Sequence, residues 1–455
     1  MKKLIALSLL IISPSVLCAT LTVKSNTSIQ EVVKQAKDGD TILVEPGLYH
    51  QSVYIDQQNI TFRGLTVDGK HAVLDGQMKL NDGIIASGHG SVIDGFHVKG
   101  YKGNGIMTQG ANNFKIINNF VHGAFYGIFP QYGKNGLIKG NTVTGAEDAG
   151  VYVGMCDNID VIENIAYGNV MGLEFENTRN GLMANNNVYN NSAGLVMTLI
   201  PGLPVKTASN LVIRNNIVKN NNLKNFAPAS SIAASVPTGI GIAIAGVDNV
   251  IVKDNDIEGN ANVAIASFDL VSFGLGGDPK LDPYVDNFQI LENNYRNNGS
   301  SPRGILGDMI AMSGMERVDI MDTGKGRNSC HVQQEGVKTL GLDRFTICGD
   351  DYDRTNFKTA QLAEPAETPI YTDEQKGRLT YLAVCTGCHS YNSVLHGPSM
   401  QSIQALYNNN LPGLMAYIKQ PVRKRKDFPE MPEQDYLGDK TIKAIANYIL
   451  HELEK

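Results

Sequence analysis

The stretch from residue 172 to residue 188, GLEFENTRNGLMANNNV, decides the fold because both of its halves recur along the chain. Its first half opens with glycine, an apolar residue, any residue and an apolar residue. This phrase starts at residues 105, 127, 150, 172 and 194, with looser copies at 241 and 263. The second half is an apolar residue, two residues, an asparagine, one residue and an apolar residue. It recurs at Asn119, Asn141, Asn164, Asn186, Asn216, Asn255 and Asn293. A nearly constant period of 22 or 23 residues indicates stacked structural repeats.

Each repeat holds two or three short alternating segments separated by glycine or asparagine turns. A helical period does not fit this pattern, and 22 residues is too short for a propeller blade. A coil of three short strands does fit, and successive coils then stack at about 4.8 Å. Asparagine tolerates left-handed turns, and its amide can ladder from coil to coil, so this series is interpreted as structural. We therefore expect an all-β, right-handed parallel β-helix over residues 20–349.

The beginning of the solenoid reads as an amphipathic helix over residues 29–36, which would cap the open end of the coil. This stretch resembles the first segment of secreted β-helix proteins such as pectin-degrading enzymes. The repeats resemble the generic carbohydrate-associated β-helix family, which includes alginate epimerases, polysaccharide lyases and the periplasmic maturation factor of nitrous oxide reductase. The resemblance covers about residues 20–348. It is specific for the fold and leaves the activity open, because one fold hosts many chemistries.

Residues 1–19 have two lysines, an apolar run and a small-residue exit, as in a secretory signal peptide. Cleavage after Ala19 is expected, with a lipid anchor on Cys18 as the alternative, and either predicts a periplasmic protein. No other apolar stretch approaches 18 residues, so no transmembrane segment is expected in the mature chain. The net charge of −6 gives no electrostatic footprint for nucleic acid. In an oxidising compartment a Cys330–Cys348 disulfide is expected, and Cys156 is interpreted as a small buried hydrophobe.

The composition changes near residue 350, and residues 350–370 read as a linker before a helical domain over residues 371–455. This last domain contains CTGCH, which is the attachment pattern of c-type haem. Cys385 and Cys388 are the expected thioether partners, and His389 is the expected iron ligand. A redox C-x-x-C lacks its βαβ context here, and a zinc site lacks a second cysteine pair. One covalent haem c is therefore the expected cofactor.

A second iron ligand should follow downstream of the motif. Met431 precedes Pro432 in a loop ahead of the final amphipathic helix, and Gly397-Pro398 follows the motif. This pattern resembles class I cytochrome c, which implies Met431 as the sixth ligand, with Met400, Met415 and His396 as rivals. The basic run at residues 422–426 is either a solvated loop or a docking patch for an acidic periplasmic redox partner.

The glycine-containing strands have one face turned into the coil and one turned out. Ile106, Ile128, Val151, Leu173 and Leu195 should point inward. The outward face should form a substrate groove with Phe129 and Tyr152 as a stacking platform, and long insertions after residues 198, 224 and 267 should wall it. Glu174 and Glu176 are outward at i and i+2, a spacing of about 6.5–7 Å that suits paired catalytic carboxylates. The alternative interpretation of these two residues is an exposed acidic patch.

Three functions remain open at this point. The main prediction is an exported single-haem electron-transfer protein whose β-helix is a binding or docking module. The first alternative is a polysaccharide-active enzyme (a glycosidase, lyase or epimerase) with a tethered cytochrome and a polysaccharide ligand. Against a lyase or epimerase, the strand face has no Arg or Lys, and only Lys206 could supply one from a loop. The second alternative is a periplasmic assembly factor for a metalloenzyme.

Overall fold

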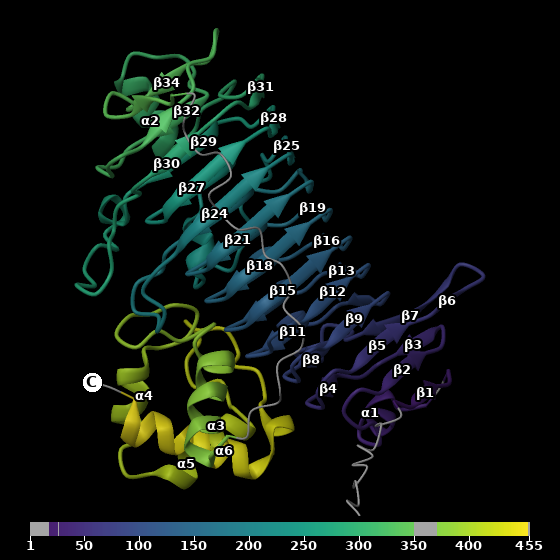
Figure 1. Cartoon of the computed structure of the whole chain (residues 1–455). Coiled ribbons are helices and arrows are strands. Elements are labelled where there is room, and N and C mark those ends of the chain that lie inside the picture. Colours follow the sequence, from purple (N-terminus) through teal and green to yellow (C-terminus); the bar gives the residue numbers. More distant parts are fainter. Residues whose placement is uncertain (1–17, 26, 350–370, 454–455) are drawn as a thin grey trace, which may run out of the picture.

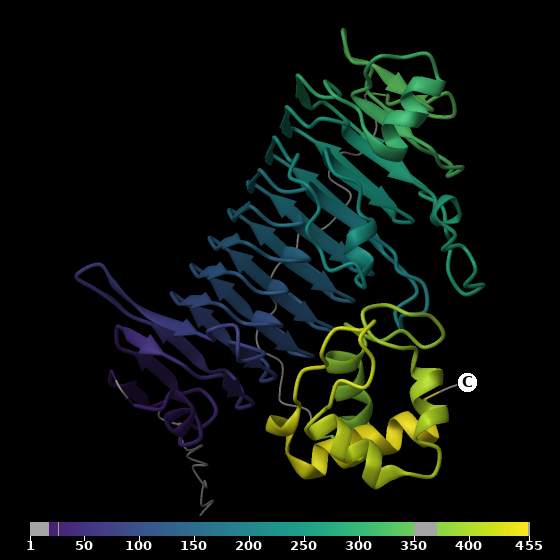
Figure 2. The same ribbon diagram turned by 180° about the vertical axis from the view of Figure 1, so that it is seen from behind.

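The computed structural model describes residues 18–25, 27–349 and 371–453 and has two parts, a long parallel β-helix and a helical domain (Figures 1 and 2). Most of the expected signal peptide (residues 1–17) and the whole expected linker (residues 350–370) lie outside the described residues. No helix among the described residues is long and apolar enough to cross a membrane.

The β-helix has three sheets of parallel strands, with one strand of each sheet in each complete coil. Sheet A contains, in spatial order, β1 (Thr20–Val23), β2 (Thr41–Val44), β5 (Thr61–Gly64), β9 (Val92–Asp94), β12 (Lys115–Ile117), β15 (Lys134–Lys139), β18 (Asp157–Ile162), β21 (Arg179–Ala184), β24 (Ser209–Arg214), β27 (Asp248–Lys253), β30 (Phe288–Ile290), β33 (Cys330–His331) and β35 (Thr346–Ile347). Sheet B contains β3 (Gly47–Tyr49), β7 (Lys70–Asp75), β10 (His97–Lys99), β13 (Phe120–His122), β16 (Thr142–Thr144), β19 (Ile165–Tyr167), β22 (Asn187–Tyr189), β25 (Ile217–Lys219), β28 (Asp256–Glu258) and β31 (Asn294–Arg296), with β6 (Thr66–Val67) antiparallel to β7.

Sheet C is the sheet of the glycine-containing phrase. It contains β4 (Val53–Ile55), β8 (Ile84–Ala86), β11 (Asn104–Gln109), β14 (Tyr126–Gln131), β17 (Ala149–Gly154), β20 (Met171–Glu176), β23 (Ala193–Thr198), β26 (Ile240–Ala245), β29 (Val263–Phe268), β32 (Ile320–Asp322) and β34 (Thr339–Leu340). The five residues expected to point inward are all fully buried in the core of the coil. The glycine lets coils stack closely, since a Cβ on Gly127 would lie 2.4 Å from the backbone oxygen of Gly150.

The recurring asparagines form a buried ladder inside the turn between sheets A and B. The side-chain amide nitrogen of each asparagine from Asn119 to Asn255 donates to the side-chain oxygen of the next, at 2.9–3.1 Å. The left-handed backbone belongs to the preceding residue, for example Asn118 (φ 55°) and Asn185 (φ 57°). The ladder is therefore structural, and its asparagines serve hydrogen bonding while their neighbours make the turn.

Both ends of the solenoid are closed. At the first end, α1 (Ile29–Val33) is shorter than the expected helix over residues 29–36, and its Ile29 and Val33 are buried against the first coils. The far end carries α2 (Gly304–Met312) and the disulfide that joins Cys330 to Cys348. Cys156 is fully buried in the core of the coil. These caps cover the apolar interior that stacking would otherwise leave open.

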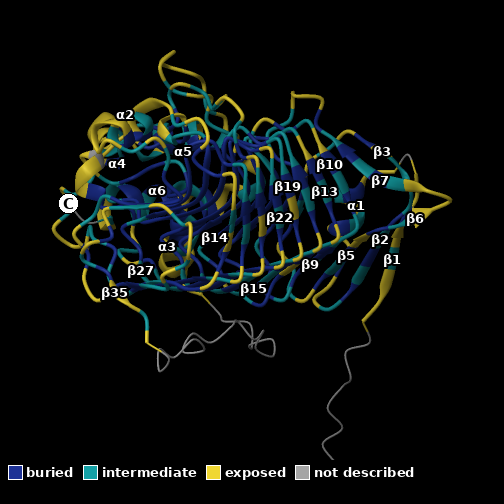
Figure 3. Cartoon of the chain, turned by 90° about the horizontal axis from the view of Figure 1, so that it is seen from above, coloured by how far each residue is buried: buried dark blue, intermediate teal, exposed yellow. Residues whose placement is uncertain are grey.

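The helical domain follows from residue 371. Its elements are α3 (Asp373–Thr380), a π-helical turn (Tyr381–Cys385), α4 (Met400–Leu406), α5 (Leu411–Lys419), a 3₁₀ turn (Asp435–Leu437), α6 (Gly438–Asn447) and a second π-helical turn (Tyr448–Glu452). Thr372 caps α3 in a reciprocal pair with Gln375. The expected apolar face of the last helix is buried at Ile442, Ile445 and Ile449. Figure 3 shows that the strands are largely buried, while exposed residues gather in turns and on helices.

Candidate functional site

The helical domain is docked on the outer face of sheet C. Four hydrogen bonds between side chains cross the boundary near the centre: Tyr126 with His396 (2.8 Å), Ser231 with His396 (3.1 Å), Gln131 with Thr386 (3.2 Å) and Gln109 with Tyr436 (2.8 Å). The three insertions expected to wall this face do leave or enter sheet C, and two of them contact the helical domain. Gly202 accepts from the backbone of Tyr391, and Ile200 and Leu203 pack with Leu395.

The row of outward residues on sheet C runs through neighbouring strands in register: Tyr54, Ile85, Met107, Phe129, Tyr152, Glu174, Val196, Ala243 and Ala266. The outward direction was expected, but the open groove is a wrong prediction. Phe129 and Tyr152 are buried and pack on each other and on Tyr126. Gly387 of the CTGCH motif lies directly over Phe129, where an added Cβ would come within 2.9 Å of the ring. These rings are therefore not free to stack on a ligand while the helical domain is docked.

Lys206 is the second groove residue whose surroundings differ from the expectation. It lies on the loop between β23 and β24, and its ammonium group pairs with Asp278 at 2.6 Å. The Asp278 carboxylate also accepts from the backbone of Gly202. Lys206 thus ties two of the long insertions together, and its charge is already compensated.

Glu174 and Glu176 meet a third carboxylate, Asp148, beneath the docked domain. Glu174 and Glu176 lie on β20, and Asp148 directly precedes β17. The exposed fractions of the three residues are only 5%, 3% and 2%. The Tyr152 hydroxyl donates to Glu176, and Asp148 lies 3.8 Å from His396. We call these three residues the acidic cluster. The alternative of an exposed acidic patch does not fit this burial.

The acidic cluster is under-satisfied. One oxygen of each carboxyl group (Asp148 Oδ1, Glu174 Oε2 and Glu176 Oε1) is buried without a hydrogen-bond partner among the described residues. No Lys or Arg forms an ion pair with these carboxyls within the described part of the chain. Leaving a buried polar group unpaired costs about 1–3 kcal/mol, and more for a charge. Such a cluster is a poor way to stabilise a fold, and it is typical of a functional site.

Burial and mutual repulsion keep protons on this cluster. Burial, with a smaller contribution from the Glu176 carboxylate, raises the pKa of Asp148 to about 8. Burial raises the pKa of Glu176 to about 7, against the lowering effect of the Tyr152 hydrogen bond. Burial, and then the charges of Asp148 and Glu176, hold the pKa of Glu174 well above its ordinary range. Burial lowers the pKa of His396 to about 4, so this imidazole is neutral and supplies no positive charge.

These pKa shifts predict that the folded protein becomes less stable between pH 6.5 and 8.5. The raised pKa values mean that the folded chain still holds protons that the unfolded chain has released, so stability falls as pH rises through about 7 and 8. Histidines are neutral in both states over most of this window. We expect the melting temperature to drop by several degrees, as measured by calorimetry, and the triple variant Asp148→Asn, Glu174→Gln, Glu176→Gln to flatten the profile. A wild-type melting temperature that is constant or rises across the window would contradict this.

The CTGCH residues line a second feature of the boundary, a mainly apolar cavity of about 300 Å³, which we call the motif cavity. Cys385, Cys388, His389 and Met431 all line it, and Met107, Tyr126 and Phe129 of sheet C form its far wall. The two thiols are free, and burial raises their pKa values to about 12. A redox-active C-x-x-C needs a thiolate of lowered pKa, so the cavity does not favour that alternative.

The surroundings of the histidines distinguish His389 from its rival. Nδ1 of His389 lies 2.8 Å from the backbone oxygen of Pro398, which leaves Nε2 as the nitrogen without a hydrogen bond to the described residues. Gly397 is required there, since a Cβ would lie 2.4 Å from the His389 ring. Both ring nitrogens of His396 bond to the β-helix, so His396 is not available as an iron ligand. Met400 lines the motif cavity with Met431, whereas Met415 does not.

A zinc-type site has no counterpart in the described part of the chain, where no three or more His, Cys, Asp or Glu side chains are placed to share a metal ion. The sequence pointed to Glu174 and Glu176 but missed Asp148 and Tyr126, and it named His396 only as a rival iron ligand. The sequence offers only a weak signal for these residues. Asp148 comes directly before the strand at residues 149–154, and His396 comes directly before the Gly-Pro pair.

Comparison with known proteins gives the fold. A family profile described as right handed beta helix region matches residues 51–199 and 104–275, so the chain contains a right-handed β-helix region. The match does not extend to the helical domain, whose class I cytochrome c identity stays a prediction. A search of curated protein sequences found no match.

Solved structures that resemble the chain share its fold at low identity. The A-module of a mannuronan C-5 epimerase from Azotobacter vinelandii is 16% identical, covering 72% of this chain and 89% of that one, with a TM-score of 0.48. A mannuronic acid specific polysaccharide family 6 lyase from human gut microbiota is 12% identical (72% and 84% covered, TM-score 0.43). DFA-IIIase from Arthrobacter chlorophenolicus A6 is 13% identical (74% and 95% covered, TM-score 0.43).

These findings correct the main functional prediction. The prediction of an electron-transfer protein with a β-helix docking module is contradicted: the family match is to a right-handed β-helix region, and the solved structures named above are an epimerase, a polysaccharide lyase and DFA-IIIase. The geometry agrees with the correction in one respect. A passive docking surface has no need of three buried, partly unpaired carboxyls, which cost stability.

Proposed function

We propose that the chain is a polysaccharide-active enzyme, specifically a glycoside hydrolase, whose reacting groups are Glu174 and Glu176 on sheet C. The observation that carries the proposal is the acidic cluster: three carboxyl groups, nearly fully buried on one sheet face, each with one oxygen that has no partner among the described residues. Glycoside cleavage needs one protonated and one ionised carboxyl group on either side of the scissile bond. Neighbouring carboxyls whose pKa values are pushed apart meet this need.

The two roles follow from the surroundings of each residue. Glu174 has the more strongly raised pKa and stays protonated at neutral pH, so it would donate its proton to the glycosidic oxygen as the carbon–oxygen bond breaks. Glu176, with a pKa of about 7 and a hydrogen bond from Tyr152, would take a proton from the attacking water. Water is the co-reactant, and both carboxyls are reset by returning that proton to solvent and taking one up. Burial keeps Glu174 protonated, and Asp148 adds to this effect when it is ionised.

The cluster does not favour a uronate lyase or epimerase. Those reactions need a cation or equivalent donor to neutralise the substrate carboxylate, and no Lys or Arg pairs with the cluster among the described residues. A uronate carboxylate beside Asp148, Glu174 and Glu176 would meet repulsion. The substrate reaches the cluster only when the helical domain moves away from sheet C, because the docked domain covers it.

We also propose that the helical domain holds one haem c in the motif cavity, in an exported protein. The residues fit the group: two free thiols and one histidine with its Nδ1 anchored line an apolar cavity. Arg423, Lys424 and Arg425 also line the cavity and could balance the haem carboxylates. Met431 is the proposed sixth ligand, and Met400 its rival. Bound haem would supply one-electron oxidation and reduction. Export agrees with the Cys330–Cys348 disulfide.

A turnover screen tests the proposed reaction. The full chain is incubated with neutral polysaccharides (glucans, xylans, mannans and fructans) and with polyuronates, and new reducing ends or released oligosaccharides are measured. We expect hydrolysis of at least one neutral polysaccharide without the unsaturated product of a lyase. Cleavage confined to polyuronates, or no cleavage of any substrate, would overturn the proposal.

A further inference from the structure

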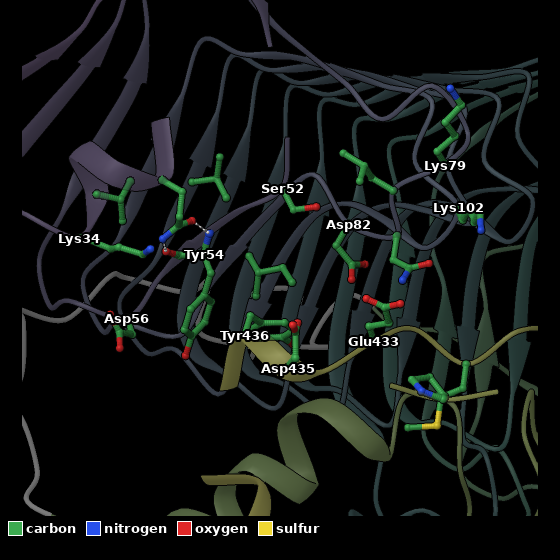
Figure 4. A pocket seen from close by; sticks show the side chains of 18 of the residues that line it. Lys34, Ser52, Tyr54, Asp56, Lys79, Asp82, Lys102, Glu433, Asp435 and Tyr436 are labelled. Carbon is green, nitrogen blue, oxygen red and sulfur yellow. Dashed lines mark hydrogen bonds between the residues drawn. The ribbon is translucent and has the colours of Figure 1, made fainter. Parts of the chain in front are cut away.

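A second, open cavity of about 640 Å³ lies beside the motif cavity and is not part of the acidic cluster. It is built by both domains, from the first coils of sheet C on one side and the segment of residues 421–436 on the other (Figure 4). Asp82, Glu430, Met431 and Tyr436 line both cavities, so the two adjoin. We call this cavity the open cleft.

The floor of the open cleft is aromatic. Tyr54 on β4 and Tyr436 of the 3₁₀ turn have ring centroids 4.9 Å apart at an interplanar angle of 56°. Their hydroxyl groups have partners: Tyr54 bonds to Ser87 at 2.9 Å, and Tyr436 bonds to Gln109 and Gln434 at 2.8 Å. The rings therefore offer apolar surface rather than free hydroxyls. Such surface suits the apolar faces of sugar rings.

The walls of the open cleft supply more hydrogen-bond acceptors than free cations. Asp82 is only 6% exposed; its Oδ1 accepts from both nitrogens of Asn104, at 2.6 and 3.0 Å, and its Oδ2 has no hydrogen bond to the described residues. Figure 4 shows Asp82 in the middle of the cleft, near Glu433 and Tyr436. Asp56, Glu433 and Asp435 add exposed carboxylates.

The lysines of the open cleft are mostly engaged. Lys34 pairs with Glu31 at 2.8 Å, and Lys102 pairs with Glu430 at 3.4 Å across the domain boundary. Among the described residues, Lys79 has only a long contact with Gln77, at 3.5 Å. Lys79 is thus the one cleft lysine without an ion pair among the described residues, whereas several carboxylates line the cleft. This balance of charge disfavours an anionic ligand. The mixture of carboxylates and a single ammonium group suits hydroxyl groups, which both donate and accept.

We propose that the open cleft binds a neutral oligosaccharide, as the anchoring subsite of the enzyme. The assignment rests on the proposed function, which it deepens by naming the substrate class. Tyr54 begins the same outward row of sheet C that reaches Glu174 five strands further on. At strand spacing that is about 24 Å, so a chain anchored in the cleft must be long to reach the acidic cluster. The cleft is the part of this row that remains accessible while the helical domain is docked.

Titration calorimetry on the full chain tests this subsite. The probes are neutral hexasaccharides of glucose, xylose, mannose and fructose, with a hexauronate of equal length. We expect at least one neutral hexasaccharide to bind and the hexauronate to bind at least about tenfold more weakly, a difference of about 1.4 kcal/mol. Tyr54→Ala should weaken the neutral ligand about tenfold. Tyr167→Ala, which removes a tyrosine from the outer face of sheet B, is the matched control and should have no effect.

A second variant protects the test from a folding defect, because Tyr54 is half-buried. Asp435→Asn changes an exposed carboxylate of the cleft and should weaken binding several-fold with an unchanged melting temperature. Equal or tighter binding of the hexauronate, or unchanged binding by both cleft variants, overturns the subsite. The two proposals can fail separately. Glu176→Gln should lose turnover and keep binding in the open cleft. The cleft variants should raise KM and leave kcat, measured with saturating polymer, unchanged.

Discussion

Glu176→Gln should lower the rate of glycan hydrolysis by about 10²–10⁴-fold, the range typical for loss of a general acid or base. The amide keeps the shape of the side chain and can still meet the Tyr152 hydroxyl, but it cannot take a proton from water. Binding of the oligosaccharide should change little, because the anchoring contacts lie in the open cleft. Initial rates on the polysaccharide that the wild type cleaves, together with calorimetric binding, separate the two effects.

Glu163→Gln is the matched control for this prediction. Glu163 is an exposed residue of the same solenoid that pairs with Lys139 at 3.2 Å, so its substitution repeats the chemical change away from sheet C. The control should retain wild-type turnover. If Glu176→Gln keeps more than about half of the wild-type rate, Glu176 is not a reacting group and the assignment of roles is wrong.

Replacing both Cys385 and Cys388 by alanine should abolish covalent haem attachment, which is the second large effect. The thiols are the only described cysteines that line the motif cavity, and Cys156 and the Cys330–Cys348 pair lie elsewhere in the chain. Wild-type chain produced in a host with haem-attachment machinery should keep one haem after acid–acetone extraction, as seen in the intact mass. The double variant should have the mass of the bare polypeptide.

Cys156→Ala is the control for haem attachment, since Cys156 is buried inside the coil, and this variant should keep its haem. Met431→Ala should remove the sulfur-to-iron absorption band of the oxidised protein while leaving the covalent bond intact. A band that survives would assign Met400, which lines the same cavity. A wild-type chain that loses its haem to acid–acetone would contradict the proposed thioether links.

The repeat phrase was enough to predict the solenoid because its determinants are local. Each glycine, inward apolar residue and ladder asparagine repeats the environment of the equivalent residue one coil away. The alternation of Leu173 and Glu174 also assigned the inward and outward faces correctly. The left-handed turn was placed one residue too late, on the ladder asparagines, because adjacent asparagines such as Asn118 and Asn119 are indistinguishable by composition.

The burial of the outward face could not be read from the repeats. It depends on contacts between segments that are far apart in sequence, such as Tyr126 with His396, which are 270 residues apart. A pattern of alternating residues says which side chains leave the coil and says nothing of what covers them. Glu174 and Glu176 were found by their i, i+2 spacing on one strand, whereas Asp148 joins them from a turn in the neighbouring coil.

The central claim is that the sheet C face beneath the helical domain is where the glycan reacts. Hydrogen-exchange mass spectrometry of the Glu176→Gln variant, with and without the polysaccharide that the wild type cleaves, tests it most directly. The account predicts slower exchange in β17 and β20 on binding, together with faster exchange in residues 386–397, where the helical domain leaves its contacts with Phe129 and Tyr126. Protection confined to sheets A or B, with unchanged exchange across β17, β20 and residues 386–397, would contradict it.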